Sequence, residues 1–385
     1  MTTKTVADIN QYSGSSVNPL EHPEQLYELY SVPSFETGYP EIVKGKDIGS
    51  TKLTVEEGDV LVCKINPRIN RVWVVKHNTE YPLLASSEWI VVRNKNIDAN
   101  YLKWYFSSPT FRTLLNSQVA GIGGSLTRAQ PKQVAKYSVP VPSRSKQQKV
   151  SENLDKVNEL IALRKEQLAK LDRLVKSRFV ELFGSLHDNE KGLDIVSIEE
   201  LCTLIKDGTH QTPTYTEDTL NGFKFLSSKD VMTQKICWDD IKYIPAELHE
   251  KLYATIQPQR NDIFMSKNGV NYGVAAVNDT DEVFDIYVSL ALLRPKTNKV
   301  NPVYLRCAIN NPDTKRQFDS SIKGIGVPNL HLGEIKKTKI LLPPMSKQNE
   351  FVAFVEQTDK SKLVIQQSLD KLELLKKSLM QEYFG

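Results

Sequence analysis

Apolar side chains recur every three or four residues in two long stretches of the chain. The first stretch runs from Lys146 to Phe183 without a proline or glycine, and the second runs from Lys347 to Phe384 with a weaker apolar stripe. Spacings of three and four place these side chains on one face of a helix, as in a coiled coil. We therefore expect two long helices, each of about 39 residues and about 58 Å at a rise of 1.5 Å per residue.

Elsewhere the pattern is that of short strands. Runs rich in β-branched and aromatic residues are separated by Gly, Pro, Asn and Asp, which favour turns. Strands are expected at residues 59–62, 71–75, 89–92, 262–265 and 288–293, and further helices at 101–116 and 302–319. The expected fold class is therefore α/β, of the mixed α+β kind.

The two halves of the chain repeat one plan. When the sequence is shifted by 201 residues, the segment from Pro142 to Gly184 falls on the segment from Pro343 to Gly385 with 13 identities in 43 positions and no gap. Upstream, shorter matches continue at shifts of 203 and 183, so the second half carries about 20 additional residues between Val231 and Asp262. An ungapped match of this length indicates an internal duplication.

This duplication divides the chain into two globular domains and two helices, arranged as an internal pseudo-twofold repeat. We expect a first domain at residues 1–141, a first helix at 142–185, a second domain at 186–342 and a second helix at 343–385. The helices are alike, whereas the domains share a framework but few side chains.

Composition and charge exclude several classes of protein. The 385 residues are 40% hydrophobic and 25% charged, as in ordinary globular domains. No apolar run is long enough for a membrane helix, and the N-terminus has no signal-peptide core, so we expect a cytoplasmic chain without membrane contact. The four cysteines form no Cys-x-x-Cys pair, which favours reduced thiols and no metal site. The net charge of +4 does not by itself indicate nucleic-acid binding but permits local basic patches.

Motifs for catalysis and cofactor binding are missing from the sequence. There is no phosphate-binding loop, no Gly-x-Gly-x-x-Gly, no Asn-Pro-Pro-Tyr/Phe, no His-Glu-x-x-His and no Gly-x-Ser-x-Gly. His210 could serve as a base, but the sequence offers it no nucleophile. We therefore expect no catalytic residues and no cofactor in this chain.

Several motifs, in this order and twice, resemble those of a known family. Each long helix is preceded by prolines and begins with a Ser-Lys-Gln sequence, at 145–147 and at 346–348. Residues 207–213, Asp-Gly-Thr-His-Gln-Thr-Pro, form a further motif, and residues 58–69 have a counterpart at 261–267. The whole chain resembles the specificity subunit of a type I restriction–modification system. It departs from the family's Pro-Leu-x-x-Gln pattern at Lys146 and Lys347, where glutamate is frequent.

The resemblance implies a non-catalytic reader of double-stranded DNA. Each variable domain would recognise one half of a bipartite site. The two helices would lie antiparallel as a coiled coil, set the spacing between the half-sites and dock two methyltransferase subunits that carry S-adenosylmethionine and methylate adenine. A restriction and translocase subunit, using ATP and Mg²⁺, could join to cut unmodified DNA.

Candidate DNA-binding residues lie in loops at corresponding places of the two halves. A polar, basic stretch between two predicted strands suits base edges, because Arg and Lys pair with guanine and Asn with adenine. Its members are Lys64, Asn66, Arg68, Asn70 and Arg71 in the first half, and Lys267, Asn268, Asn271 and Tyr272 in the second. The alternative is a solvated hairpin.

Two further groups are candidates for DNA contact. After the glycine-rich segment 121–124, hydroxyl and basic side chains suit phosphate contacts, with a solvated turn as the alternative. They are Ser125, Thr127, Arg128 and Lys132, and in the second copy Lys323, Asn329 and His331. In the 207–213 motif, Thr209, His210 and Thr212 either touch DNA or brace the domain.

Two other functions compete with the DNA reader. One is an orphan or decoy interaction subunit that retains the helices but has no DNA selectivity. The other is a fused or degenerate restriction–methylation enzyme, which would need a catalytic motif that the sequence does not contain.

Overall fold

The fold was analysed in a computed structural model that describes residues 2–117, 119–120, 127–322 and 328–385. Contacts divide the chain into two units. Unit 1 consists of Met1–Glu166 and Gln366–Gly385, and unit 2 consists of Gln167–Ile365. Each unit therefore contains one globular domain and a part of both long helices.

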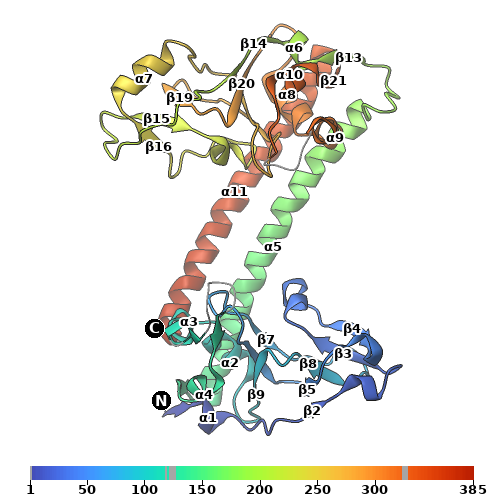
Figure 1. Cartoon of the computed structure of the whole chain (residues 1–385), viewed down its shortest axis with the longest axis vertical. Coiled ribbons are helices and arrows are strands. Elements are labelled where there is room, and N and C mark those ends of the chain that lie inside the picture. Colours follow the sequence, from blue (N-terminus) through green and yellow to red (C-terminus); the bar gives the residue numbers. More distant parts are fainter. Residues whose placement is uncertain (1, 118, 121–126, 323–327) are drawn as a thin grey trace. The chain divides into compact units, whose positions relative to one another are not determined.

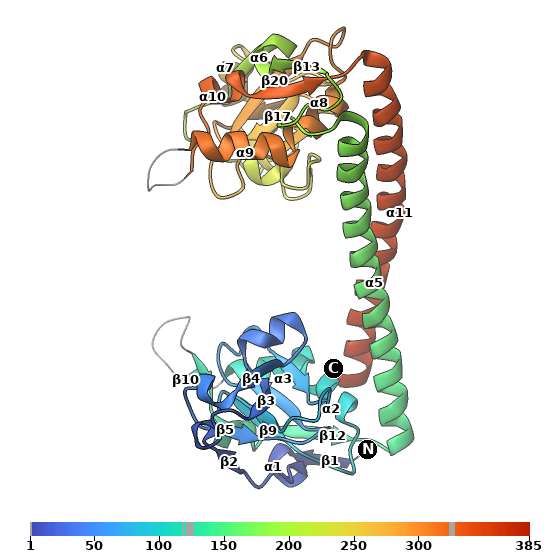
Figure 2. The same ribbon diagram turned by 90° about the vertical axis from the view of Figure 1, so that its right-hand side faces the viewer.

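The two predicted long helices are confirmed. Helix α5 spans Arg144–Phe183 and helix α11 spans Met345–Phe384, each with 40 residues, and they lie side by side (Figures 1 and 2). Within unit 1, Lys165 Nζ lies 2.9 Å from Glu373 Oε1 and Asn153 Nδ2 donates to Tyr383 Oη. These contacts show that the two helices run antiparallel. From the first contact to the second, the residue number falls on α5, whereas it rises on α11.

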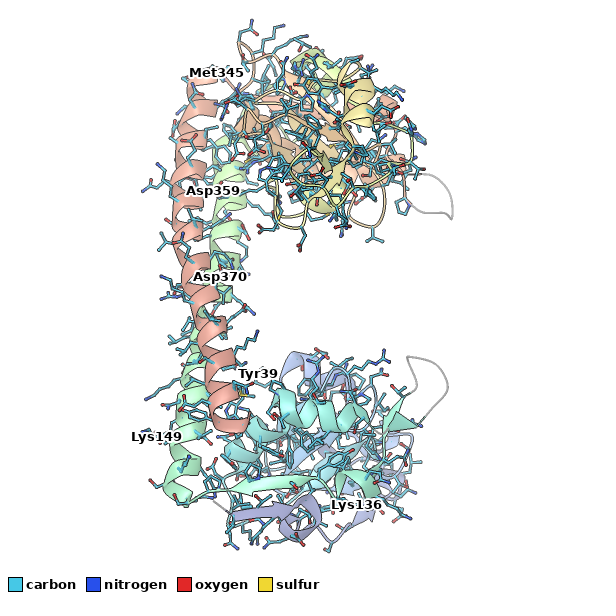
Figure 3. All side chains as sticks on the ribbon, turned by 90° about the vertical axis from the view of Figure 1, so that its left-hand side faces the viewer. Tyr39, Lys136, Lys149, Met345, Asp359 and Asp370 are labelled. Carbon is cyan, nitrogen blue, oxygen red and sulfur yellow. The ribbon has the colours of Figure 1, made fainter. Side chains whose placement is uncertain are left out.

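The same direction is found within unit 2. Lys362 Nζ of α11 lies 2.6 Å from Asp172 Oδ1 of α5, and Arg178 Nη2 lies 3.5 Å from Glu350 Oε1. Lys235 of the second domain pairs with Asp359 of α11, whose position along the helix is marked in Figure 3. Unit 2 is thus held together by contacts of its domain with α11 and by contacts between the helices.

In both domains the first and last strands pair antiparallel and close the domain. Strand β1 (Thr2–Thr5) pairs with β12 (Ser138–Val141), and β13 (Asp194–Ser197) pairs with β21 (Lys339–Leu342). Each first strand leads into a one-turn helix, α1 (Val6–Ile9) or α6 (Ile198–Leu201). Both short helices begin with a capping box, in which a hydroxyl and a carboxylate satisfy backbone amides reciprocally.

The first domain contains two main sheets. The five-stranded sheet has the order β2 (Ser16–Val17), β5 (Lys52–Thr54), β8 (Leu83–Ala85), β3 (Leu26–Tyr30), β4 (Glu41–Lys44). The three-stranded sheet has the order β7 (Val72–Val74), β6 (Val60–Cys63), β9 (Trp89–Val92). Two short elements, β11 (Arg128–Ala129) and α4 (Pro131–Val134), precede β12, and β11 pairs with β10 (Val119–Ala120).

The second domain repeats the central part of this plan. Its four-stranded sheet has the order β14 (Cys202–Asp207), β20 (Leu290–Pro295), β17 (Ile263–Ser266), β18 (Ala275–Val277). A three-stranded sheet has the order β16 (Lys242–Ile244), β15 (Phe223–Leu226), β19 (Phe284–Ile286). Helix α7 (Ala246–Tyr253) lies where the repeat predicts additional residues, and α10 (Leu332–Lys337) precedes β21. Figure 1 labels most of these elements.

The two helices predicted inside the domains are each broken in two, so that part of the expectation is wrong. The structure has α2 (Ala99–Phe106) and α3 (Pro109–Ser117) in the first domain, and α8 (Pro302–Ile309) and α9 (Pro312–Ser321) in the second. Both breaks come just before a proline, which has no amide hydrogen and disfavours helical geometry in the residue before it. A polar side chain caps each new start, because Phe111 N donates to Ser108 Oγ and Asp313 N donates to Asn311 Oδ1.

The ends of the long helices are buried in the cores of the domains. Phe183 of α5 packs edge-on against Tyr304 and Phe351 in unit 2. Phe384 of α11, its counterpart in the repeat, packs against Tyr101 and Tyr105 in unit 1. The Phe-Gly that ends each helix repeat is therefore a core contact that fixes a helix end to a domain.

Candidate nucleic-acid interface

The candidate residues of the first domain surround a tight turn between β6 and β7. Asn66 and Asn70 have φ angles of +48° and +51°, in the left-handed region that asparagine tolerates better than most residues. Between them lie Pro67, Arg68 and Ile69, of which Arg68 and Ile69 are exposed. The backbone thus turns sharply at two fixed points and presents the residues between them.

The second domain has the same turn between β17 and β18. Gly269 and Gly273 have φ angles of +84° and +85° and stand 203 residues after Asn66 and Asn70. A Cβ on Gly273 would lie 2.7 Å from Phe318 Cδ2, so the close packing there also requires glycine. The three inner residues are Val270, Asn271 and Tyr272.

In both domains the turn is hydrogen-bonded to the segment that follows the glycine-rich stretch. The Asn66 amide donates to Thr127 O at 3.0 Å, and the Ala129 amide donates to Lys64 O at 2.9 Å. In the second domain the Gly269 amide donates to Pro328 O at 3.0 Å, and the Leu330 amide donates to Lys267 O at 2.9 Å. The structure therefore brings together two groups of candidates that are far apart in the sequence.

Several candidate side chains are engaged within the protein. Lys267 is 5% exposed and pairs with Asp207 at the end of β14. Arg71 Nε donates to Glu36 Oε1 at 3.0 Å, and Arg128 Nη2 donates to Glu88 Oε1 at 3.1 Å.

Tyr272 is engaged as well, in a contact with α9. Its hydroxyl donates to Asp319 Oδ1, and Lys315 Nζ lies 3.4 Å from the centre of its ring. These contacts orient the side chain beside the turn.

Buried polar atoms without a partner gather at the same place. Among the described residues five buried side-chain atoms have no hydrogen-bond partner: Asn66 Oδ1, Asn70 Oδ1, Thr127 Oγ1, Asp207 Oδ1 and Arg306 Nε. Three of them belong to the turn of the first domain and its neighbouring segment. Asp207 Oδ1 adjoins the turn of the second domain, where it forms the ion pair with Lys267 Nζ. Because proteins rarely leave such atoms unpaired, the three at the turn of the first domain are unusual.

Other candidates face solvent or lie elsewhere. Exposed candidates besides Arg68 and His210 are Arg128, Lys132, Thr212, Asn268, Asn271, Asn329 and His331, and Lys64 is half-buried. Thr209 is held by its backbone, which pairs with Ile286 and Val288, while His210 is 76% exposed at 3.7 Å from Asp207 Oδ2. Ser125 and Lys323 lie outside the described residues.

Two framework contacts that recur in both domains were not predicted from the sequence. Arg93 binds Asp59 with two hydrogen bonds of 2.8 and 2.7 Å, and Arg294 binds Asp262 with two of 2.8 Å. Both carboxylates are 1% exposed, and the hydrogen bond to Asp59 raises the pKa of Arg93. The sequence did show that all four residues recur between the two halves. It did not show that each arginine pairs with the aspartate of its own half.

The second framework contact explains the Ser-Lys-Gln motif. Gln147 Oε1 accepts from the Asp98 amide, and its Nε2 donates to Pro142 O at 2.8 Å. Gln348 likewise accepts from the Asn301 amide and donates to Pro343 O at 2.8 Å. Each glutamine is buried and connects the start of a long helix to the helix that packs beside it.

The long helices carry exposed apolar residues at positions related by the repeat. Leu163 and Val364 correspond at the shift of 201, as do Leu174 and Leu375, and all four are between 45% and 66% exposed. Unit 1 contains Leu163 and Leu375, each two positions in sequence from a member of the Lys165–Glu373 pair, and unit 2 contains Leu174 and Val364, each two positions from a member of the Asp172–Lys362 pair. Each unit thus carries one exposed apolar residue of this kind on each helix, and the two residues in a unit are called its apolar site.

Searches for a metal site and for a membrane span were negative within the described ranges. No group of three or more His, Cys, Asp and Glu residues there could hold a metal ion. Nor is any helix in those ranges long and apolar enough to cross a membrane.

Comparisons with known proteins agree on one family. The sequence profile of the type I restriction modification DNA specificity domain matches twice, at residues 25–173 and 190–374. The specificity subunit of type I restriction enzyme MjaVIII from Methanocaldococcus jannaschii is 21% identical over 349 residues, which cover 86% of this chain and 80% of the relative.

Solved structures show the same fold. A chain from the study "Structural basis underlying complex assembly and conformational transition of the type I R-M system" superposes with a TM-score of 0.57 at 17% identity, covering 100% of this chain and 97% of its own. The S subunit of a type I restriction–modification system from M. genitalium gives a TM-score of 0.57 at 12% identity, with 100% and 96% covered.

Proposed function

The chain belongs to the type I restriction–modification DNA specificity family and is therefore a non-catalytic specificity subunit with two DNA-recognition domains. We propose that each domain reads one half of a bipartite site in double-stranded DNA. The observation that carries this proposal is the turn that recurs in both domains with the same backbone and different side chains. A shared framework with different contact residues suits two different half-sites. The decoy subunit and the fused enzyme are not favoured.

Within each domain the exposed candidates divide by the part of DNA they suit. Arg68 and Asn271 carry the donors and acceptors that pair with guanine and adenine edges in the major groove. Lys132, Arg128, Asn329 and His331 lie on or after the neighbouring segment and suit phosphate oxygens, which position a protein on the duplex. Thr209, His210 and Thr212 belong to the loop that adjoins the turn of the second domain through Asp207.

The helices supply the second part of the proposed function. A helix of 40 residues is about 60 Å long, which exceeds the ~34 Å of one turn of DNA, so it can separate two readers on one duplex. The apolar sites of units 1 and 2 are equivalent by the repeat and suit two identical partners. We assign these sites to two methyltransferase subunits.

The chemistry of the complex belongs to those partners. The methyltransferase subunits would bind S-adenosylmethionine and methylate adenine, and a restriction and translocase subunit with ATP and Mg²⁺ can join the same complex. The described residues of this chain contribute recognition, spacing and docking. The assembly would act in the cytoplasm, where its DNA lies.

Methylation mapping tests the proposal directly. The chain is co-expressed with its methyltransferase subunits, and the host DNA is sequenced for methyladenine. The expected result is one split motif with two short halves and a fixed gap, and exchange of residues 1–141 for those of another specificity subunit should alter only one half. A stable complex that methylates no defined motif would contradict the proposal and support the decoy subunit.

A further inference from the structure

We propose that the turn at 66–70 in the first domain and 269–273 in the second is one interchangeable recognition element, whose exposed inner residues select the bases while its two end residues only shape the backbone. This inference rests on the proposed function and assigns base selection within it. It adds Ile69 and Val270 to the recognition residues, and it gives Asn66 and Asn70 a framework role.

The backbone of the two turns is the same. Both ends of each turn are left-handed, at positions separated by 203 residues. The flanking strands pair in the same register, since Leu61 lies opposite Trp73 and Phe264 lies opposite Ala276 at the same shift. The Cys63 amide donates to Arg71 O, and the Ser266 amide donates to Val274 O. The backbone of the turn is therefore alike in both domains, and the middle inner position is exposed in both, as Arg68 and as Asn271.

The surroundings of the two turns hold them in the same way. Besides the two bonds from each turn to the segment after the glycine-rich stretch, the Lys64 amide donates to Glu88 O and the Lys267 amide donates to Ser289 O, both at 2.9 Å. A turn that is hydrogen-bonded on both sides keeps its backbone when its inner residues change. This rigidity is what a recognition element needs to present different side chains from one scaffold.

The end residues of the first turn are less exposed than Arg68 and Ile69. Asn70 Nδ2 donates to Phe106 O, and the Oδ1 atoms of Asn66 and Asn70 are both buried. The second domain has glycine at both places, with no side chain at all. These residues are selected for their left-handed backbone.

The inner residues differ in chemistry and are mostly exposed. The first domain presents Arg68 and Ile69, the latter 54% exposed, and the second presents Asn271 and Val270, the latter 83% exposed. Arg68 and Asn271 have no side-chain hydrogen bond or ion pair among the described residues. An exposed aliphatic residue beside a base-reading polar one suits contact with the methyl group of thymine in the major groove.

Reciprocal exchange of the inner residues is the main test, carried out in the complete methyltransferase complex. One variant replaces Pro67, Arg68 and Ile69 with Val, Asn and Tyr, and the other replaces Val270, Asn271 and Tyr272 with Pro, Arg and Ile. The readout is the methyladenine motif. We expect the first variant to change only one half of the motif and the second variant to change only the other half.

A framework variant provides the matched control. Asn66→Gly combined with Asn70→Gly gives the first turn the end residues of the second, so the complex should methylate the wild-type motif. A changed motif in this variant would overturn the assignment of the end residues. An unchanged motif in both exchange variants would overturn the assignment of the inner residues.

Single substitutions decide the case in which an exchange variant does not assemble. Arg68→Ala and Asn271→Ala remove exposed side chains, and each should relax one base position of one half-site by about 10- to 100-fold. Suppose that the wild-type complex reads a split motif but neither substitution relaxes any base position of it. The inference then fails while the proposed function stands. If the wild-type complex reads no split motif, the proposed function itself fails.

Discussion

At the scale of single residues, burial separates the four cysteines into two classes. Cys63 and Cys202 are 1% and 7% exposed, whereas Cys237 and Cys307 are half-buried. Burial raises the pKa of Cys202 to about 12 and also raises the pKa of Cys63. Because the thiolate is the nucleophile, the two buried thiols should be unreactive at neutral pH.

Alkylation of the folded chain at pH 8 checks this difference. We expect iodoacetamide to modify Cys237 and Cys307 first, and Cys63 and Cys202 only after denaturant is added, as read by peptide mass spectrometry. Rapid labelling of Cys202 without denaturant would contradict the burial.

The raised pKa of Cys202 also makes the free energy of unfolding depend on pH. The contribution of the protonated Cys202 thiol to that free energy is complete below pH 9. It is lost as the pH rises from about 9 toward about 12, because the unfolded chain then releases the thiol proton more readily than the folded chain.

The site could be predicted from the sequence only in part at this scale. The polar stretches at 64–71 and 267–272 stand between predicted strands, so their place in a turn followed from the pattern. The pairing of Lys267 with Asp207 did not follow, because the two residues are distant in sequence and only the pairing of β14 with β20 and of β20 with β17 brings them together. Contacts set by sheet order leave no local signal.

At the scale of elements, each long helix depends on a buried glutamine at its start. Gln348 is 0% exposed and connects the Asn301 amide, which precedes α8, with Pro343 O, which precedes α11. Gln348→Ala would leave both backbone groups unpaired in a dry environment. We expect a loss of about 1–3 kcal/mol in the free energy of unfolding.

Thermal unfolding of the full chain measures this loss, with Gln357→Ala as the control. Gln357 lies on the same helix, and its side chain is exposed without a described partner, so its replacement should change the stability by less than about 0.5 kcal/mol. Equal effects of the two substitutions would show that the buried amide contacts do not hold the helix start.

The limits of prediction at this scale come from proline. The periodic stretches gave the long helices almost to the residue, since no proline or glycine interrupts either stretch. The helix predicted at 101–116 was in fact two helices, because Pro109 can begin a helix as well as end one, and Ser108 provides the cap that makes a new start favourable. The local pattern alone does not choose between a kinked helix and two helices.

At the scale of the whole molecule, the duplication has a consequence for stoichiometry. A chain with two equivalent surfaces can bind two copies of one partner, whereas a chain with one surface binds one. The repeat relates Leu163 to Val364 and Leu174 to Leu375. Each residue of the apolar site in unit 1 therefore has its counterpart in the apolar site of unit 2, on the other long helix. Removing one site should therefore remove one partner and leave the other.

Native mass spectrometry of the assembled complex can count the methyltransferase subunits. With Leu163→Glu and Leu375→Glu together, or with Leu174→Glu and Val364→Glu together, we expect one methyltransferase subunit instead of two, because a carboxylate in an apolar contact is costly to desolvate. All four substitutions together should leave none. Leu220→Glu is the control, since Leu220 is 93% exposed and belongs to the second domain, not to either long helix. Two bound subunits in the fourfold variant would show that docking uses other surfaces of the chain, and the repeat of the apolar sites would then have no bearing on assembly.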